Sequence, residues 1–401
     1  MSSDIFEVRG VSRTDRQARV NELEALGFTW ANLDQEQYWV DQLIVMNRNT
    51  YEELEEASRQ LWAIFDKAVR FVCGRHDLYQ MVGIPDVLWE SLDTTLMNEP
   101  GLLSRYARFD FAISGTGDIK LLELNADTPT GYVEASVATP WMCKQYEVDS
   151  PNELMAKRVQ EAWAIERPDT AACVAYGTHA EDSGTIDMLV RHSGLDVACV
   201  DCLDLWIDEG IVRDGSGRAI ERMFALYPKE WMAVDDGGDA LAYAIETGQL
   251  QLFNPPHAIL LQSKGLQALI WGLHELNLLY MPEEKAVIDR YMLPTYNKAV
   301  FDGSFVSKSM FGREGGSVKL FDGSGQLEVQ DEAGFDTSRL FPLIYQKRAE
   351  LAQIHLESGT FHLLTGMFVI NGEPCGLLGR AGGPITGNAS HFVAIGVGDR
   401  R

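Results

Sequence analysis

Apolar residues recur three and four positions apart through most of the first hundred residues, which is the spacing of amphipathic helices. The pattern is clearest over 18–30, 36–74 and 85–98, and we expect helices there. Thr50 and Glu53 have the spacing of a capping box, which predicts a helix start inside the second segment. The aromatic side chains of these helices are expected to pack in a core.

Short alternating runs replace this pattern after residue 104. Residues 105–114 and 119–127 alternate apolar and polar side chains, and the Gly-Thr-Gly-Asp sequence at 115–118 lies between them. A turn sequence between two such runs predicts a β-hairpin. Residues 130–146 are then expected to begin another helix.

Residues 166–258 have a different rhythm, in which short apolar runs alternate with helical segments. Such alternation is typical of a small open α/β unit. Residues that follow its first strand would lie at the carboxyl edge of the sheet, where such sheets bind ligands.

The last third of the chain is helical over 259–280 and 281–293 and then changes to glycine-rich β structure from residue 300. Residues 361–397 predict a hairpin turned at Asn371-Gly372, followed by a loop and a terminal strand. The chain as a whole is therefore expected to have a mixed α/β (α+β) fold.

Length, composition and charge narrow the range of functions. With 401 residues, of which 46% are hydrophobic, two or three compact units are expected. The formal charge is 34 − 59 = −25, which disfavours nucleic acid and anionic membranes as partners. The same charge suits a cationic amine substrate, although it also serves solubility alone.

The chain also suggests a cytoplasmic location. No uncharged apolar run reaches about 18 residues, so we expect no membrane-spanning helix, and the polar N-terminus does not resemble a signal peptide. The six cysteines are scattered without a disulfide framework. Cys199 and Cys202 form a C-x-x-C without a second pair, so a chance spacing is favoured over a metal or redox site.

The densest polar cluster lies on the two strands of the first predicted hairpin. Arg108 and Asp110 alternate on one strand, and Glu123 and Asn125 on the other, so each pair shares a face. If the strands pair, two carboxylates, an amide and a guanidinium meet on one surface, which suits magnesium and a phosphoryl group. An exposed hairpin face with cross-strand ion pairs explains the same spacing equally well.

Other cationic and glycine-rich segments are weaker signals. Lys308 precedes the loop 312–316, which contains three glycines, a reasonable phosphate cradle that lacks the P-loop order. Lys264 interrupts an apolar helical run, where a side chain that reaches back to solvent is the commoner explanation. Arg380 and the loop that follows it form a further possible anion site.

Taken in order, the motifs resemble the glutathionylspermidine synthase-like ATP-grasp family, and within it the stand-alone acid–amine ligases without an amidase domain. The resemblance rests on RFD at 108–110, ELNADTPT at 123–130, FVSKSMFGREGGSV at 305–318, LIYQ at 343–346, and GLLGR with ITGNASHFV near the C-terminus. It implies an ATP-grasp fold with a Rossmann-like pre-ATP-grasp unit and a glycine-rich lid subdomain.

The resemblance also implies a division of the chain into three parts. We assign residues 1–165 and 346–401 to a helical N-terminal part with the ATP-grasp core, 166–258 to the pre-ATP-grasp unit, and 259–345 to the ATP-binding lid. The metal site lies in the first of these parts.

Roles for individual residues follow from the same resemblance. It implies Mg²⁺ ligands at Asp110, Glu123 and Asn125, and a catalytic, nucleotide-contacting arginine at Arg108 that stabilises phosphoryl transfer. The implied ATP-binding residues are Lys264, Lys308, Gly312, Gly315, Gly316 and Gln346. For Lys264 this reverses the interpretation from burial preference alone.

The substrate pockets match the family less well. Arg380 matches an arginine near the peptide substrate, and Thr128 and Thr130 can replace hydroxyls that meet its carboxylate. Glu181 and Asp182 stand where the spermidine-binding enzymes carry two glutamates, although Asp182 also suits the start of a helix. Other glutathione-contacting positions differ, so neither glutathione nor spermidine follows from the sequence.

The implied activity is ATP- and Mg²⁺-dependent ligation of a small, peptide-like acid to an amine through an acyl phosphate. The alternative is an ATP-binding regulatory or sensor protein of the same fold without ligase turnover. The complete set of phosphate- and metal-binding residues favours the ligase, because a degenerate member is expected to lose at least one of them.

Overall fold

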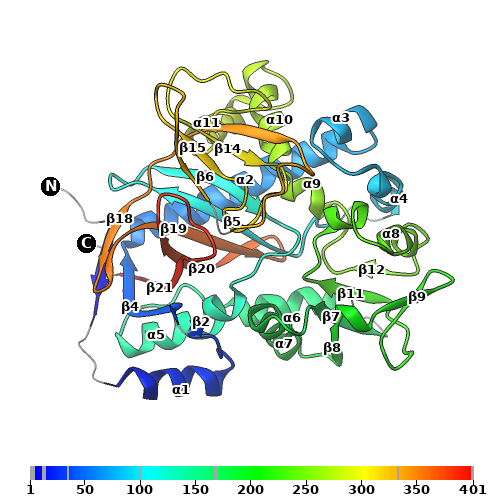
Figure 1. Cartoon of the computed structure of the whole chain (residues 1–401), viewed down its shortest axis with the longest axis horizontal. Helices are drawn as coiled ribbons and strands as arrows, with labels where there is room; N and C mark the ends of the chain where they lie inside the picture. The colour runs from blue at the N-terminus through cyan, green and yellow to red at the C-terminus, as the bar shows by residue number, and fades with distance from the viewer. Residues whose placement is uncertain are drawn as a thin grey trace.

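The computed structural model describes residues 5–10, 15–33, 36–98, 101–166, 170–331 and 334–398. Its centre is an eight-stranded sheet with the order β1-β4-β21-β20-β19-β5-β6, in which β18 also pairs with β19 (Figure 1). Neighbouring strands are antiparallel except for the parallel pair β4 and β21. The strands are Phe6–Arg9 (β1), Trp39–Met46 (β4), Tyr106–Ile113 (β5), Ile119–Asn125 (β6), Gln353–Leu356 (β18), Gly359–Ile370 (β19), Glu373–Gly382 (β20) and His391–Val397 (β21).

Strand β4 corrects the expectation that residues 36–74 form one helix. Alternate side chains of β4 enter two different cores, Ile44 on one face and Leu43 on the other, and both are fully buried. A strand buried on both faces carries apolar residues at consecutive positions, here residues 43–46, which periodicity cannot distinguish from a helix. The helix α2 starts only at Arg48, where Asn47 accepts a hydrogen bond from the Thr50 backbone N–H, so the predicted Thr50 capping box is wrong.

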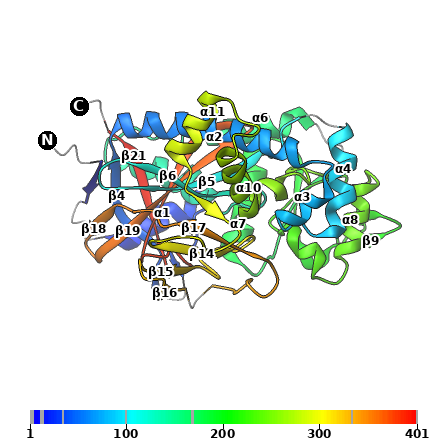
Figure 2. The same cartoon turned by 90° about the horizontal axis from the view of Figure 1, so that it is seen from above.

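Helices cover both faces of the central sheet. The long helix α2 (Arg48–Val72) lies across one face with α11 (Pro282–Tyr291) beside it (Figure 2). Phe65 packs there against Phe109 of β5 in a T-shaped arrangement, as expected for a core aromatic residue. The other face carries α1 (Arg16–Leu26), the π-helix Glu134–Ala138, α5 (Thr139–Gln145) and α6 (Met155–Glu166).

The α/β unit expected over 166–258 is present at one side of the molecule (Figure 1). Its four-stranded parallel sheet has the order β12-β11-β7-β8 and packs against α7 (Ala180–Ser193). Its strands are Ala171–Ala175 (β7), Val197–Asp201 (β8), Arg222–Ala225 (β11) and Gln251–Leu252 (β12), and α8 covers Gly238–Glu246. A 3₁₀ turn, Lys229–Ala233, follows β11 and faces the site described below.

A five-stranded antiparallel sheet forms a cover over the central sheet. Its order is β13-β17-β14-β15-β16, with strands Thr295–Tyr296, Leu343–Lys347, Phe305–Ser309, Lys319–Phe321 and Leu327–Gln330 respectively. The division into three domains stays a prediction, and β17 runs across its boundary at 345/346.

The helix expected over 259–280 is interrupted. It consists of α9 (Ala258–Gln262) and α10 (Lys264–Glu275), because Ser263 between them has an extended backbone. The Ser263 hydroxyl accepts a hydrogen bond from the Gly265 N–H at 3.1 Å and so caps α10. This break places Lys264 at the start of a new helix, where its side chain enters the site.

The remaining elements are short. They are β2 (Asn32–Leu33), β3 (Glu36–Gln37), α3 (His76–Met81), α4 (Trp89–Asn98), β9 (Trp206–Asp208), β10 (Ile211–Arg213) and the 3₁₀ turns Asp86–Leu88 and Cys202–Asp204. The hairpin turn predicted at Asn371-Gly372 is confirmed, since both residues have positive φ, 54° and 82°.

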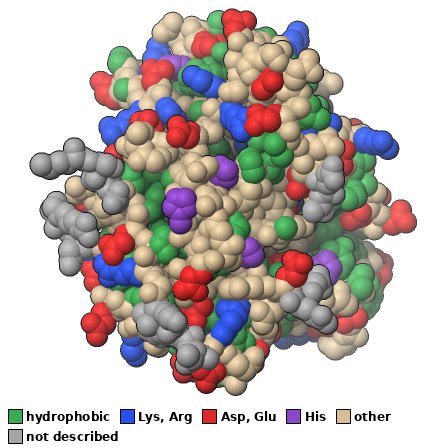
Figure 3. Space-filling model, turned by 60° about the vertical axis from the view of Figure 1, so that its left-hand side comes forward, with side chains coloured by type: hydrophobic (Ala, Val, Ile, Leu, Met, Phe, Trp, Pro, Cys, Tyr) green, Lys and Arg blue, Asp and Glu red, His purple; other side chains and the backbone are tan. Residues whose placement is uncertain are grey.

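Three general features of the described residues are their surface charge, the hydrophobicity of their helices and the state of their cysteines. On the face shown in Figure 3, acidic and basic side chains are interspersed. Among the described helices, none is both long enough and apolar enough to cross a membrane. All six cysteines lie in the described part of the chain and are free thiols.

Candidate functional site

The polar face of the β5–β6 hairpin is the centre of the site. Arg108 lies opposite Asn125, and Asp110 lies opposite Glu123. The Arg108 guanidinium donates to both Asp110 oxygens, at 2.6 and 2.9 Å, and the Asn125 amide donates to Asp110 at 2.9 Å and to Glu123 at 3.2 Å. The predicted convergence of these four groups is confirmed, and the exposed-hairpin alternative is wrong, since only Glu123 is more than 8% exposed.

Two lysines reach this face from distant parts of the chain. Lys264 Nζ lies 3.1 Å from Glu123 Oε2 and donates to the Gly312 carbonyl at 2.7 Å. Lys308 Nζ donates to Gln346 Oε1 at 2.9 Å and to the Leu122 carbonyl at 3.2 Å. Lys264 is only 2% exposed, so its side chain does not reach back to solvent.

At Glu123 and at Lys308, burial and neighbouring charges shift the pKa in opposite directions. Burial alone would raise the pKa of the Glu123 carboxyl, but Lys264 and Lys308 lower it to about 2. Burial lowers the pKa of Lys308 to about 8, although Glu123 opposes this shift. The free protein therefore holds a firmly ionised carboxylate beside a lysine that loses its proton easily.

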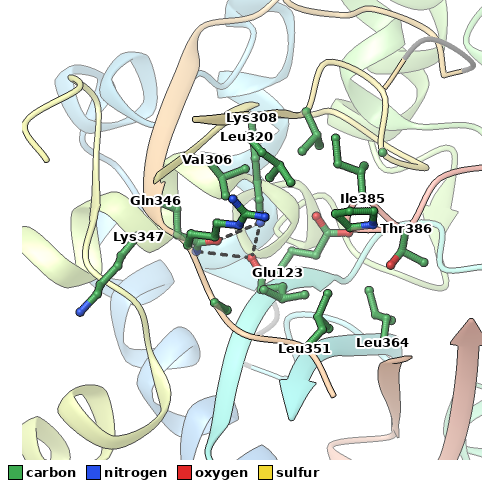
Figure 4. A pocket seen from close by; sticks show the side chains of 16 residues that line it. Glu123, Val306, Lys308, Leu320, Gln346, Lys347, Leu351, Leu364, Ile385 and Thr386 are labelled. Carbon is green, nitrogen blue, oxygen red and sulfur yellow. Dashed lines mark hydrogen bonds between the residues drawn. The ribbon is translucent and has the colours of Figure 1, made fainter. Parts of the chain in front are cut away.

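A cavity between the cover sheet and the central sheet contains the first part of the site. Val306 and Leu320 of the cover face Leu351 and Leu364 across the cavity, and Lys308 extends towards Glu123 at its base (Figure 4). Gln346 also lines it and donates to Gln267 and Thr295. The cavity walls are largely apolar, and Glu123 and Lys308 form a charged end beside the hairpin face, a distribution that suits a nucleotide base and its phosphates. Lys347 and Arg348 also line the cavity.

A second cavity meets the first at the charged end. Both are lined by Glu123, Gly315, Leu364 and Thr386. The second extends towards the α/β unit, and its wall carries three arginines, Arg108, Arg313 and Arg380. The hairpin face thus lies at the junction between the two cavities.

The glycine-rich loop 312–316 closes over this junction. A Cβ on Gly315 would lie 3.0 Å from the Gly387 backbone, and one on Gly316 would lie 2.5 Å from the Phe335 carbonyl. Gly312 is equally constrained, since a Cβ there would lie 2.8 Å from the Gly316 carbonyl. The three glycines permit a tight loop that packs directly on neighbouring backbone.

The predicted substrate residues divide into two groups. Thr128, Thr130 and Arg380 line the second cavity. The Thr130 carbonyl accepts from Arg108 at 2.5 Å, and Arg380 donates to the Gly387 carbonyl at 2.8 Å. The buried Nε of Arg380 has no hydrogen-bond partner among the described residues.

Glu181 and Asp182 lie in the first turn of α7, which begins at Ala180. Asp182 lines the second cavity and lies 3.5 Å from His179, whereas Glu181 is not part of that wall. Burial and the buried carboxylate of Glu134 raise the pKa of Glu181 to about 7. Because His179 is the N-cap residue, Asp182 does not cap the helix.

Sequence reasoning missed several residues that complete the site. Arg313 and Glu230 form an ion pair at 3.0 Å beside the second cavity. Gln262 accepts hydrogen bonds from the Ala126 and Asp127 N–H groups and fixes the end of β6. Each contact joins segments far apart in the chain, so no local pattern indicated it.

The hairpin face also fits a magnesium ion chemically. Asp110 and Glu123 each accept a hydrogen bond from the Asn125 amide nitrogen, so the two carboxylates lie close together, while the Asn125 amide oxygen accepts from Gln262 at 3.4 Å. Carboxylate and amide oxygens are hard donors, and magnesium commonly binds few protein ligands together with phosphate oxygens. The described residues contain no cluster of three or more His, Cys, Asp or Glu side chains suited to a metal. The donor set of Asp110, Glu123 and Asn125 therefore fits an ion shared with a phosphorylated ligand rather than a closed protein cage.

Comparison with known proteins identifies the family of the chain. Residues 11–397 match the family model described as glutathionylspermidine synthase preATP-grasp. The chain is also 24% identical to a Haemophilus influenzae protein named "Putative acid--amine ligase", over 94% of this chain and 96% of that relative. Because the family model matches nearly the whole length, the chain belongs to the glutathionylspermidine synthase family, whose ATP-grasp-related fold it shares.

Proposed function

We propose that this protein is an ATP-dependent ligase that joins a small carboxylic acid to an amine through an acyl phosphate. The observation that carries the proposal is the meeting of two cavities at Glu123, where Arg108, Asp110, Lys264 and Lys308 converge. Family membership and the name of the Haemophilus relative support the same class of reaction.

The smaller cavity is the proposed ATP site. Adenine would lie between the apolar walls near Gln346. The phosphates would extend to Lys308, which lines the cavity, and to Lys264, which lies 3.1 Å from Glu123. Asp110, Glu123 and Asn125 would hold Mg²⁺, which when bound neutralises phosphate charge. The glycines of the loop 312–316 would cover the phosphates with backbone N–H groups.

The larger cavity is the proposed acid site, because its three arginines attract carboxylates. A carboxylate oxygen attacks the γ-phosphorus of ATP, the bond to the β-phosphate oxygen breaks, and ADP leaves. Arg108 faces the oxygens on which charge accumulates, and Arg380, Thr128 and Thr130 orient the rest of the acid.

The amine then attacks the carbonyl carbon of the acyl phosphate, loses a proton, and expels phosphate as the amide forms. Asp182 lines the cavity and Glu181 lies beside it, so both are proposed to attract the cationic amine. The closed loop 312–316 keeps water from the acyl phosphate. Since the reaction consumes ATP and the cysteines are free thiols, we place it in the cytoplasm.

A screen of ADP release over pairs of short peptides with amines or amino acids tests this proposal. We expect one pair to give ADP, phosphate and an amide, and Lys308→Ala and Asp110→Asn to abolish all three products. Unchanged amide formation in both variants would refute the proposed centre. Tight ATP binding without release by any amine would instead favour a nucleotide sensor.

A further inference from the structure

Arg313 of the glycine-rich loop crosses from the cover to the α/β unit. Its Nε and Nη2 donate to Glu230 Oε1, at 3.2 and 3.0 Å, and its Nη1 donates to the Thr128 hydroxyl. Glu230 belongs to the 3₁₀ turn that follows β11, and Thr128 follows β6. One side chain of the loop thus joins three parts of the chain at the larger cavity.

Glu230 depends on this contact. Its side chain is 1% exposed, and its second oxygen, Oε2, has no hydrogen-bond partner among the residues that the structure describes. Arg313 is the cation paired with it. If the loop opened, a buried carboxylate would lose its counter-charge, which is strongly unfavourable. Opening is therefore opposed from the side of the α/β unit.

A ring contact reinforces the same junction. Trp231, next to Glu230, packs against Phe335, with ring centroids 5.6 Å apart. The Phe335 carbonyl in turn approaches Gly316 so closely that a Cβ there would lie at 2.5 Å. The loop is thus held at Arg313 by an ion pair and at Gly316 by the segment that Trp231 supports.

We propose that Glu230 is a positioning residue, which fixes Arg313 beside Thr128. Glu230 thereby couples closure of the loop 312–316 to the occupancy of the larger cavity. An acid that reaches Thr128 meets an arginine whose direction Glu230 has already set. Glu230 itself is outside the wall of that cavity, since its side chain is covered by Arg313. The proposal rests on the proposed function only in treating residues 312–316 as the nucleotide lid.

The contact between Glu230 and Arg313 that holds the loop is called the latch below. Hydrogen exchange of residues 312–316 in the nucleotide-free protein tests this latch without any substrate. We expect Glu230→Gln and Arg313→Gln each to speed exchange there at least about tenfold, and the double variant to exchange no faster than either single variant. Glu284→Gln is the matched control, because it removes the partner of Lys67 in an ion pair between α2 and α11. It should leave exchange of the loop unchanged.

A second readout separates positioning from general stability. Binding of AMP-PNP with Mg²⁺, measured by calorimetry, should weaken in Glu230→Gln but recover in part in Glu230→Asp, which restores the charge. If Glu230→Gln does not fold, Arg313→Lys keeps the charge, cannot make all three contacts, and should still loosen the loop.

Three results would overturn the latch: unchanged loop exchange in the Glu230 and Arg313 variants, effects that multiply in the double variant, or equal loosening by Glu284→Gln. Failure of the wild-type protein to bind AMP-PNP would count against the proposed function instead. The two failures are distinguishable because the exchange experiment contains no nucleotide.

Discussion

The lowered pKa of Lys308 predicts that nucleotide binding takes up a proton. In the free protein, burial lowers this pKa from 10.5 to about 8. A fall of this size corresponds to about 3 kcal/mol less preference for the ammonium form. At pH 8.5 about three-quarters of Lys308 is therefore neutral. A bound triphosphate adds negative charge beside Nζ, raises the pKa again, and should draw in about 0.7 proton per site.

Calorimetric titration with AMP-PNP and Mg²⁺ measures this uptake. The apparent enthalpy at pH 8.5, plotted against the ionisation enthalpy of several buffers, has a slope equal to the number of protons taken up. The slope should fall towards zero at pH 7, where Lys308 is already protonated, and the affinity should fall as the pH rises above 8.

Lys308→Met should remove most of the uptake and weaken binding at least about tenfold, which is about 1.4 kcal/mol. Lys285, a partly exposed lysine of α11 that donates to Asn277, provides the control variant Lys285→Met. Equal proton uptake by wild type and Lys308→Met would refute the assignment of Lys308 to the phosphates.

Three further predictions concern other parts of the site. Gly366→Ala places a Cβ 2.9 Å from Arg108 Cδ and 3.3 Å from Asp110 Oδ1. Turnover should therefore fall at least about tenfold, while the free energy of unfolding in urea changes by less than about 1 kcal/mol. A loss of stability large enough to explain the loss of turnover would contradict this. Asn254→Ala leaves several buried backbone groups without their partner and should lower the urea unfolding free energy by about 3 kcal/mol, and a change within about 0.5 kcal/mol would exclude that role. Glu181 ionises as the pH rises through about 7, so the KM for the amine should fall between pH 6 and pH 8; the same pH dependence in Glu181→Gln would remove Glu181 from the amine site.

The hairpin that carries the proposed metal donors was predictable because its signals are local. Alternation places Arg108 with Asp110 and Glu123 with Asn125, and the short turn at 115–118 brings the two strands into register. Spacing alone left the choice between a site and a surface open. Burial decides it, and burial depends on helices and a cover sheet that lie elsewhere in the chain.

Strand β4 was not predictable in the same way. It lies between two cores, so both of its faces are apolar, and the helix α2 follows immediately after Asn47. The spacing of apolar residues over 36–74 therefore hides a change of secondary structure at Asn47. The antiparallel pairing of β4 with β1 and its parallel pairing with β21, some 350 residues later, make the strand evident.

Contacts between distant segments account for the rest. Arg313 and Glu230 are 83 residues apart; Arg313 lies inside the FGREGG motif but was given no role of its own, and Glu230 belongs to no recognised motif. The two threonines at 128 and 130 were identified, but their environment depends on the loop that closes over them. Residue types thus indicated the proposed phosphate end of the site, whereas the proposed substrate end is defined by tertiary contacts.

The most direct test of the central claim follows one oxygen atom. With the acid labelled with ¹⁸O in its carboxylate and the matching amine identified by the screen, an acyl phosphate requires that one labelled oxygen leaves in the inorganic phosphate. We predict equal amounts of ADP, amide and singly labelled phosphate. Amide formed with unlabelled phosphate, or with AMP and pyrophosphate in place of ADP, would contradict the account.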